Sequence, residues 1–439
     1  MSQPRSPVPS TLRAWGEALV TAAAGTAVML VVAALGLWAA GAGDLPGGVF
    51  PRVVAAVVVM AVGGSVELSG DAGFLAQTDA AIDVIPLSVT LAGSLVTAAV
   101  FLRPLRVRAV TDVRELLGRV ARTAVLWLLL LLLLAAVARH TFTLPVGNGI
   151  EQDLGEALGV TPRVGFRADL PPTLGFGLLW VLAVLALAFL VSRKAPLPSR
   201  LLHFQNSVRP PAFAMLLVLL GYVAIGLVAG LVTLLTQGHP AETLAVLLLG
   251  LPNLAWIALG LGMGGTWEGH VDQAIGLPMP HVLDQVLRSK GVDRTLDMSS
   301  IARYDGRAWL LVAVAAVALL SAAFVAAVRS PVRTPAWRHA VEMAVATAVT
   351  LLVVGLTTPI SARYGLSLIG IGDLGGGLGG QVSLRPHLLL LVVPAALWGL
   401  VTGFLGSLLA RHVRHLPGDV RDAGDDVRDA EARPPDGGR

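Results

Sequence analysis

The sequence predicts an all-α fold of the polytopic helical membrane class, with eight full transmembrane helices and two short or broken segments that enter the bilayer without crossing it. Two observations predict this fold: the composition and the placement of arginine. A mean hydropathy of +0.76, with 55% hydrophobic and only 14% charged residues, lies outside the range of water-soluble domains, in which about 25% of residues are charged. The lipid bilayer is therefore the first expected partner of this chain.

Eight apolar runs along the chain are nearly free of charge. Each is long enough to cross the ~30 Å hydrocarbon core of a bilayer as a helix. The first run exceeds the ~7–15 apolar residues of a cleavable signal peptide, so we expect a retained signal anchor. In chain order the runs are Trp15–Ala40, Val84–Leu102, Val120–Val137, Thr173–Val191, Ala212–Thr236, Ala308–Val328, Ala340–Thr358 and Leu388–Ala410.

Basic residues beside these runs predict the orientation, because such residues face the cytoplasm. If all ten apolar segments crossed, neither orientation would place every basic cluster there. When 51–66 and 243–263 are left out of the crossing count, every cluster and both termini are cytoplasmic. We therefore predict a multi-pass protein of the cell (inner or plasma) membrane. The clusters are Arg5/Arg13; Arg103, Arg106, Arg108, Arg114, Arg119 and Arg122; Arg193, Lys194, Arg200 and Arg209; Arg329, Arg333 and Arg338; and Arg411/Arg414.

Both exceptional segments contain residues that disfavour a straight transmembrane helix. The segment 51–66 is short and runs into Gly63 and Gly64, where glycine weakens a helix. The segment 243–263 carries Pro252 at its middle, which removes a helix hydrogen bond and predicts a kink or break. Such backbone at membrane depth must be buried in protein or line a wet cavity.

The order of the segments predicts a parallel internal repeat of five plus five, in which the second segment of each half is the exceptional one. Both exceptional segments end in Gly-Gly-Ser/Thr-x-Glu, at 63–67 and at 264–268. The predicted divisions are a cytoplasmic N-terminus (1–14), a first helical repeat (15–192), a cytoplasmic linker (193–211), a second helical repeat (212–410) with an external insertion at 266–307, and a disordered cytoplasmic tail (411–439).

Four short blocks of the sequence resemble the streptophobe family of very hydrophobic actinobacterial integral membrane proteins. The resemblance extends over most of Trp15–Arg411 and implies a protein of the bacterial inner membrane. It implies no activity, cofactor or site residue. The blocks are Gly63–Asp71, Leu251–Trp256, Pro280–Asp284 and Trp398–Gly406.

Polar residues beside the exceptional segments are the candidate cavity or ligand-binding residues. If 51–66 dips into the membrane, Glu67 lies near mid-depth and Asp71 on the return limb, where both can bind a cation or a polar substrate. The alternative is that these carboxylates mark the water boundary of a short segment. Asn253 either satisfies backbone groups freed at the kink or contacts a substrate. The candidates are Glu67, Asp71, Asn253 and Glu268.

No metal, cofactor or catalytic residue is predicted. Glu268, His270, Asp272 and His281 share one external stretch and are suitable metal ligands, but their spacing is not that of a zinc site. The chain has no cysteine, and the glycine tract 370–380 lacks the Gly-Lys-Ser/Thr ending of a phosphate-binding loop.

The arginine-rich stretch 103–122 places valines and leucines at helical spacing, which predicts a surface helix on anionic lipid. A docking site for a membrane or cytoplasmic protein partner is the alternative. Basic residues lie beside membrane segments and not on a soluble domain, so nucleic acid is not an expected partner. The sequence predicts no oligomeric state. The lipid- or partner-facing residues are Arg103, Arg106, Arg108, Arg114 and Arg119.

Three functions fit these features. A transporter- or permease-like bundle, with a central cavity between two broken segments, is the best mechanistic prediction, because many carriers build their sites this way. The alternative is a non-transporting membrane scaffold or sensor that binds protein partners. The third is an intramembrane enzyme that acts on lipid-linked substrates. The eight apolar runs carry no carboxylate or arginine at mid-span, which disfavours an ion-coupled pump.

Overall fold

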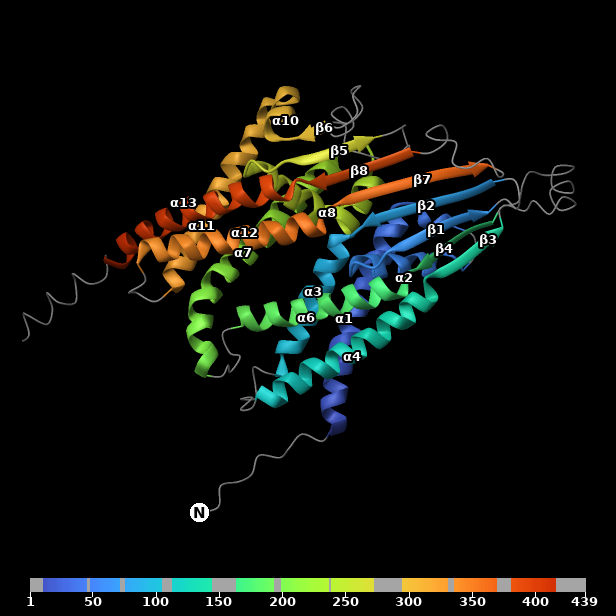
Figure 1. Ribbon diagram of the computed structural model, residues 1–439, viewed down its shortest axis with the longest axis horizontal. Helices are drawn as coiled ribbons and strands as arrows, with labels where there is room; N and C mark the ends of the chain where they lie inside the picture. Colours follow the sequence, from blue (N-terminus) through green and yellow to red (C-terminus); the bar gives the residue numbers. More distant parts are fainter. Residues whose placement is uncertain are drawn as a thin grey trace, which may run out of the picture.

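The computed structural model describes residues 11–45, 48–71, 76–104, 113–143, 163–192, 199–236, 238–271, 294–330, 335–368 and 380–415 (Figure 1). The helices are α1 (Thr11–Ala39), α2 (Phe50–Ala61), α3 (Leu87–Leu102), α4 (Val113–Val137), α6 (Leu170–Val191), α7 (Ser199–Thr236), α8 (Pro240–Gly262), α10 (Met298–Tyr304), α11 (Leu310–Arg329), α12 (Ala336–Thr357) and α13 (Leu388–His415), with the 3-10 helices η1 (Ala42–Asp44) and η3 (Gly306–Trp309). The strands are β1 (Val66–Asp71), β2 (Ala76–Val84), β3 (Arg139–Thr143), β4 (Arg163–Ala168), β5 (Trp267–Val271), β6 (Arg294–Leu296), β7 (Ile360–Leu368) and β8 (Gly380–Pro386).

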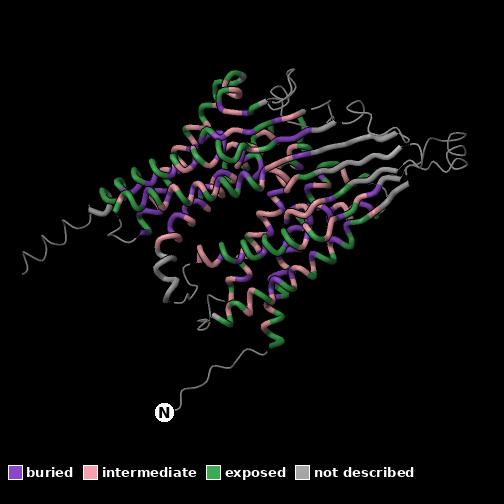
Figure 2. Tube along the Cα trace, in the orientation of Figure 1, coloured by how far each residue is buried: buried purple, intermediate pink, exposed green. Residues whose placement is uncertain are grey.

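The predicted helical membrane class is confirmed. Within the described ranges, eight helices are long and apolar enough to cross a bilayer, namely α1, α4, α6, α7, α8, α11, α12 and α13. The set differs from the predicted eight runs, because α8, in the segment predicted not to cross, is included and α3, in the run predicted as a full span, is too short. Their outer faces are exposed (Figure 2), and many of the side chains exposed there are large and apolar. Along α7, for example, Ile225, Val228, Val232 and Leu235 are all more than half exposed. Apolar surface of this extent faces lipid, since in water it would drive aggregation.

Some helix bounds differ from those predicted. The short segment at 51–66 contains the 12-residue α2. The run Val84–Leu102, predicted as a full span, contains only the 16-residue α3, which rises about 24 Å, because residues up to Val84 belong to β2. Most of the predicted linker 193–211 is helical, since α7 begins at Ser199. The tail from residue 416 onward lies outside the described residues.

The break predicted within 243–263 is corrected, because α8 runs continuously through Pro252. The hydroxyl of Ser88, from α3, donates to the carbonyl of Leu247 at 3.0 Å and accepts from the N–H of Leu251 at 3.2 Å. These two backbone groups would bond to each other in a regular helix. A side chain is therefore inserted into α8 one residue before the proline, which is a recognised way to bend a helix without ending it.

An eight-stranded antiparallel sheet joins the helix ends, and the hydropathy pattern did not predict it (Figure 1). The strand order is β3-β4-β1-β2-β7-β8-β5-β6. β1, β3, β5 and β7 each follow a helix, and the strand after each of them leads back toward another. The hairpins therefore all extend from the same side of the helices. The connections between apolar runs at 139–172 and 359–387 contain the hairpins β3–β4 and β7–β8.

Alternation of residues gives the sheet one apolar and one polar face. The apolar face is buried and belongs to the hydrophobic cores that the helices form. It includes Val66, Ala168, Trp267, Leu296 and Leu384. The other face is polar, and its charged side chains are exposed, among them those of Glu67, Asp83, Arg139, Arg167, Glu268 and Arg385.

The two halves of the chain have their main described elements in the same order. The first half runs α1-α2-β1-β2-α3-α4-β3-β4-α6, and the second runs α7-α8-β5-β6-α11-α12-β7-β8-α13, with α10 added after β6. Gly63 and Gly264, which follow α2 and α8, have φ angles of 90° and 88°. The next residue in each half, Gly64 or Gly265, donates to the carbonyl five residues earlier, at 3.0 and 2.8 Å. β2 and β7 join the halves into one sheet.

Candidate functional site

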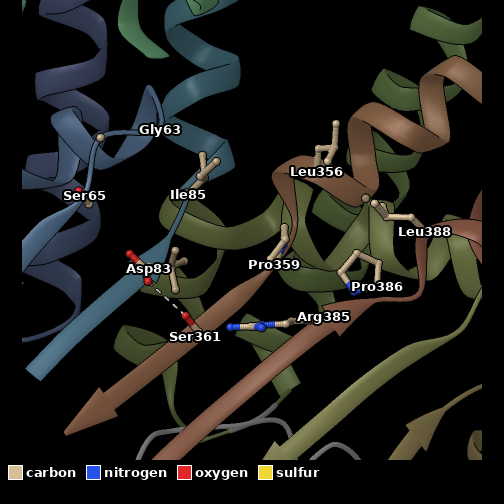
Figure 3. A pocket seen from close by; sticks show the side chains of 13 residues that line it. Gly63, Ser65, Asp83, Ile85, Leu356, Pro359, Ser361, Arg385, Pro386 and Leu388 are labelled. Carbon is tan, nitrogen blue, oxygen red and sulfur yellow. Dashed lines mark hydrogen bonds between the residues drawn. The ribbon is translucent and has the colours of Figure 1, made fainter. Parts of the chain in front are cut away.

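A cavity of about 460 Å³ lies where β2 and β7 meet the ends of the helices (Figure 3). Both halves of the chain contribute to it. Its lining residues come from the turn after α2, the end of β2, the connection from α12 to β7 and the connection from β8 to α13. They are Gly63, Gly64, Ser65, Asp83, Val84, Ile85, Gly355, Leu356, Pro359, Ser361, Arg385, Pro386 and Leu388.

The polar wall of the cavity consists of Asp83, Ser361 and Arg385. Asp83 and Ser361 stand opposite each other in β2 and β7, and the Ser361 hydroxyl donates to Oδ2 of Asp83 at 3.3 Å. Arg385 projects from β8 toward Ser361 (Figure 3). Asp83 and Arg385 are both exposed. The wall therefore offers a solute guanidinium donors beside carboxylate acceptors.

The apolar wall is formed by the sheet-side ends of two helices. Leu356, near the end of α12, is 58% exposed, and Leu388, at the start of α13, is 38% exposed. The same helices also expose Val353 and Leu389. Because these side chains continue the lipid-facing surface, the cavity opens at the boundary between apolar helices and polar sheet.

The opposite side of the cavity is the glycine turn that ends α2. Gly63 has a φ of 90°, which side chains other than glycine rarely adopt. A Cβ atom at Gly64 would lie 2.6 Å from Val59 Cγ1 and 2.7 Å from Thr173 Oγ1. The two glycines thus let the chain turn sharply from α2 into β1 while α2 stays packed against the start of α6.

The predicted carboxylates Glu67 and Glu268 lie on the polar face of the sheet and do not line the cavity. Glu67 is exposed on β1, because the chain extends into the sheet after Gly64. Glu67 stands opposite Arg167, and Glu268 stands opposite Arg385. Opposite charges at facing positions stabilise paired strands. These positions fit the water-boundary alternative.

Asn253 has a structural role at the contact between the halves. Its side chain is 4% exposed. Oδ1 accepts from the N–H of Leu87 at 3.1 Å, and Nδ2 donates to the carbonyl of Ile85 at 2.9 Å. It therefore serves the junction between β2 and α3, while Ser88 serves the backbone groups of α8 next to Pro252.

The remaining predicted residues that the structure describes do not line the cavity. Asp71 is the last residue of β1 and Arg103 follows the last residue of α3. Arg119 forms an ion pair with Glu17 and its side chain is only 12% exposed, so the expectation that it faces lipid or a partner is corrected. Arg114 lies in the first turn of α4. Arg106, Arg108, Asp272 and His281 lie outside the described residues.

The fold and the cavity define a polytopic helical membrane protein whose two halves share one sheet beyond the apolar helices. Comparison with known protein families, with curated proteins and with solved structures finds no match.

Proposed function

We propose that this protein is a non-transporting membrane scaffold or sensor that holds the polar head of an amphiphile in the cavity between its halves. The observation that carries this proposal is the position of the cavity. Asp83, Ser361 and Arg385 form its polar wall directly beside the exposed apolar ends of α12 and α13. A ligand with a charged head and an apolar tail matches both surfaces, as small-molecule sites require.

The arginines support placing this cavity at the extracytoplasmic surface. α3 and α11 lead away from the sheet and end at Arg103 and Arg329. α12 leads into the sheet and carries Arg338 in its first turn. Because basic residues at span ends face the cytoplasm, the helix ends remote from the sheet are cytoplasmic, with both termini. The proposed ligand then enters from the outer leaflet.

The matching order of elements supports a parallel internal repeat as part of this proposal. Each half would supply one side of the cavity, with Gly63–Ser65 and Asp83 from the first half and Ser361 and Arg385 from the second. In this arrangement, a ligand in the cavity contacts both halves and stabilises their association.

The side chains of the polar wall favour a phosphodiester lipid whose head group carries a hydroxyl or an amine. The guanidinium of Arg385 suits a phosphate, which it can bind through two parallel hydrogen bonds. The neighbouring carboxylate of Asp83 accepts hydrogen bonds and repels additional negative charge. A single-charged phosphate next to a donor group therefore fits better than a phosphomonoester.

Lipid binding to the purified protein in nanodiscs tests this proposal. For a short-chain phosphatidylglycerol probe, Arg385→Ala is expected to raise the Kd about tenfold or more, because a hydrogen bond to a charged group contributes about 1.5–3 kcal/mol and 1.4 kcal/mol is tenfold. Arg307→Ala is the control, since Arg307 is exposed in η3, at the sheet end of α11, and does not line the cavity. Equal losses in both variants, or no loss in either, would contradict the proposal.

The transporter alternative has one supporting observation, which is that the end of α2 borders the cavity through Gly63, Gly64 and Ser65. Flux into proteoliposomes that depends on Arg385 would replace the scaffold proposal with this one. Chemical turnover of a bound lipid-linked substrate would instead support the enzyme alternative.

We also propose that this protein is a member of the streptophobe family. Two of the four blocks that carry the resemblance form close contacts. Gly63–Asp71 makes the turn after α2 and the strand β1. In Trp398–Gly406, a Cβ at Gly399 or Gly403 would lie 2.6 Å or 2.8 Å from atoms of Met343 in α12. Small residues of this kind let membrane helices approach closely, which is a reason for such blocks to recur in relatives.

A further inference from the structure

The two outermost strands of the sheet correspond to the two strands that pair where the halves of the chain meet. Among the described strands, β3 and β6 are the outermost. The strand order within the first half is β3-β4-β1-β2 and within the second half β7-β8-β5-β6, so β6 corresponds to β2 and β3 corresponds to β7. β2 and β7 pair along the whole of Ala76–Val84. We propose that a second copy of this chain binds head to tail, with β6 of one copy pairing with β3 of the next as β2 pairs with β7.

The register of β6 is set by its inner neighbour. Val66 of β1 stands opposite Ile82 of β2, and the corresponding Trp267 of β5 stands opposite Leu296 of β6. Leu296 therefore corresponds to Ile82, and the next residue, Asp297, corresponds to Asp83 of the cavity.

The register of β3 follows in the same way from β4. Phe166 of β4 corresponds to Leu384 of β8, because the residues after them, Arg167 and Arg385, stand opposite the equivalent Glu67 and Glu268. His140 of β3 stands opposite Phe166, and Ile360 of β7 stands opposite Leu384. His140 thus has the register position of Ile360, and Thr141 has that of Ser361. In the internal junction, Asp83 and Ser361 form a hydrogen-bonded pair. At the corresponding positions of the two sheet edges, β6 is followed by Asp297 and β3 contains Thr141.

The same correspondence gives the assembled copies a second cavity. Arg167, exposed on β4, corresponds to Arg385, because Arg167 stands opposite Glu67 and Arg385 stands opposite the equivalent Glu268. Pairing of β6 with β3 would place Asp297 of one copy beside Thr141 and Arg167 of the next. The second site repeats the composition of the polar wall of the first, and neither copy holds it alone. The ligand of this second site rests on the proposed function, whereas the pairing of the copies does not.

The contact between copies is expected to be weaker than the internal junction. The first turns of α8 have no counterpart in α2, and in the internal junction Leu249 of α8 lies against Gly36 of α1. Moreover, β2 leads through Pro86 straight into α3, whereas β6 leads into α10. An unpaired strand edge is nevertheless a ready template for another strand, and head-to-tail contacts build rings or open rows.

Cysteine cross-linking in membranes tests the proposal, since the chain has no cysteine of its own. Two differently tagged variants, Thr295→Cys on β6 and Thr143→Cys on β3, are co-expressed and oxidised with copper phenanthroline. The matched positive control is the double variant Ala81→Cys/Arg363→Cys, which has the corresponding register positions in β2 and β7 and should form a disulfide within one chain. Trp38→Cys, 66% exposed on α1, reports random collision.

The proposal expects a disulfide-linked dimer that carries both tags, at least tenfold above the collision control. Dimers formed only by Thr295→Cys with itself would show a two-fold edge contact and overturn the head-to-tail arrangement. Combining both substitutions in one chain should give a ladder of oligomers. A disulfide confined to single chains would mean that the two edges meet within one molecule. Absence of interchain products while the positive control cross-links would also overturn the proposal.

Discussion

Asn253 of α8 holds the first residue of α3, Leu87, through a hydrogen bond of 3.1 Å from the Leu87 N–H to Oδ1. The two residues belong to different halves of the chain, and Asn253 is buried. The first N–H groups of a helix have no partner within that helix, so α8 supplies the cap that α3 lacks locally. The contact ties the helical halves together beside the strand pair that joins their sheets.

Replacement of Asn253 by alanine is expected to destabilise the protein by about 2–4 kcal/mol, because a buried backbone N–H on Leu87 and a partly buried carbonyl on Ile85 lose their partner at about 1–3 kcal/mol for a buried group. Thermal unfolding in detergent measures this loss. Thr243→Ala is the control, since Thr243 lies on the same helix and its hydroxyl forms an exposed hydrogen bond to the carbonyl of His239, in its own preceding turn. Similar losses in both variants would show that Asn253 does not support the junction.

Two glycines of α8 are expected to respond to alanine in opposite directions. A Cβ at Gly260 would lie 2.3 Å from Cη2 of the fully buried Trp267, whereas nothing lies within 4 Å of a Cβ at Gly250. Gly260→Ala should therefore cost about 1–3 kcal/mol through overpacking, and Gly250→Ala should be neutral or stabilising by about 0.5–1 kcal/mol. Denaturant unfolding of the two variants side by side checks the sign. Equal effects would contradict this packing.

Gly264 is expected to resist substitution because of its backbone alone. Its φ is 88°, and nothing lies within 4 Å of an added Cβ. Gly264→Ala should cost about 1 kcal/mol, as residues other than glycine do in the left-handed region. Gly306→Ala is the matched control, because Gly306 is equally open but lacks the positive φ. Melting temperatures of both variants measure the difference, and an unchanged Gly264→Ala protein would argue against the turn.

The cap of α10 is expected to weaken in acid. Burial raises the pKa of Asp297, but hydrogen bonds from Ser300 and Ser299 outweigh it and hold that pKa below its ordinary value of 3.8. A lowered folded-state pKa means that the stabilisation is complete above the unfolded-state pKa and is lost as the pH falls through the folded-state pKa. Hydrogen-exchange protection of α10 should therefore fall below pH 3.8. Asp297→Asn keeps a good cap without a titrating group, so protection that falls equally in this variant would contradict the role of the carboxylate.

Most of the helices were predictable because a run of about twenty apolar residues matches the thickness of the bilayer core when it is helical. The short α3 was not, since Val84 and Ile85 continue the apolar run although they belong to a strand and its exit. The continuous α8 was also missed, because the group that accommodates Pro252 comes from Ser88, distant in the sequence. A proline in a sequence does not reveal which tertiary partner serves the backbone around it.

The sheet has a local signal in segments that lie between the predicted membrane-spanning runs. Residues 382–385, Val-Ser-Leu-Arg, and 360–363, Ile-Ser-Ala-Arg, alternate apolar and polar side chains, which is the period of a strand with one buried face. The acidic residues Glu67 and Glu268 were recognised through their shared motif, and they mark equivalent strands. Asp83, Ser361 and Arg385 were missed, because only the pairing of β2 with β7 brings them together.

The order of strands also has a consequence for biosynthesis. β2 is synthesised early, yet its neighbour on one side is β7. Val84 therefore cannot pair with Ile360 until most of the second half has been synthesised. Until almost the whole second half has been inserted, the first half exposes an unpaired strand edge outside the helices. Nascent chains in this state are prone to join the wrong partner. A chain that stops before β7, through truncation or a stalled ribosome, therefore remains in the membrane as an incomplete protein with an aggregation-prone strand edge. Degradation by quality-control proteases is the expected fate of that product.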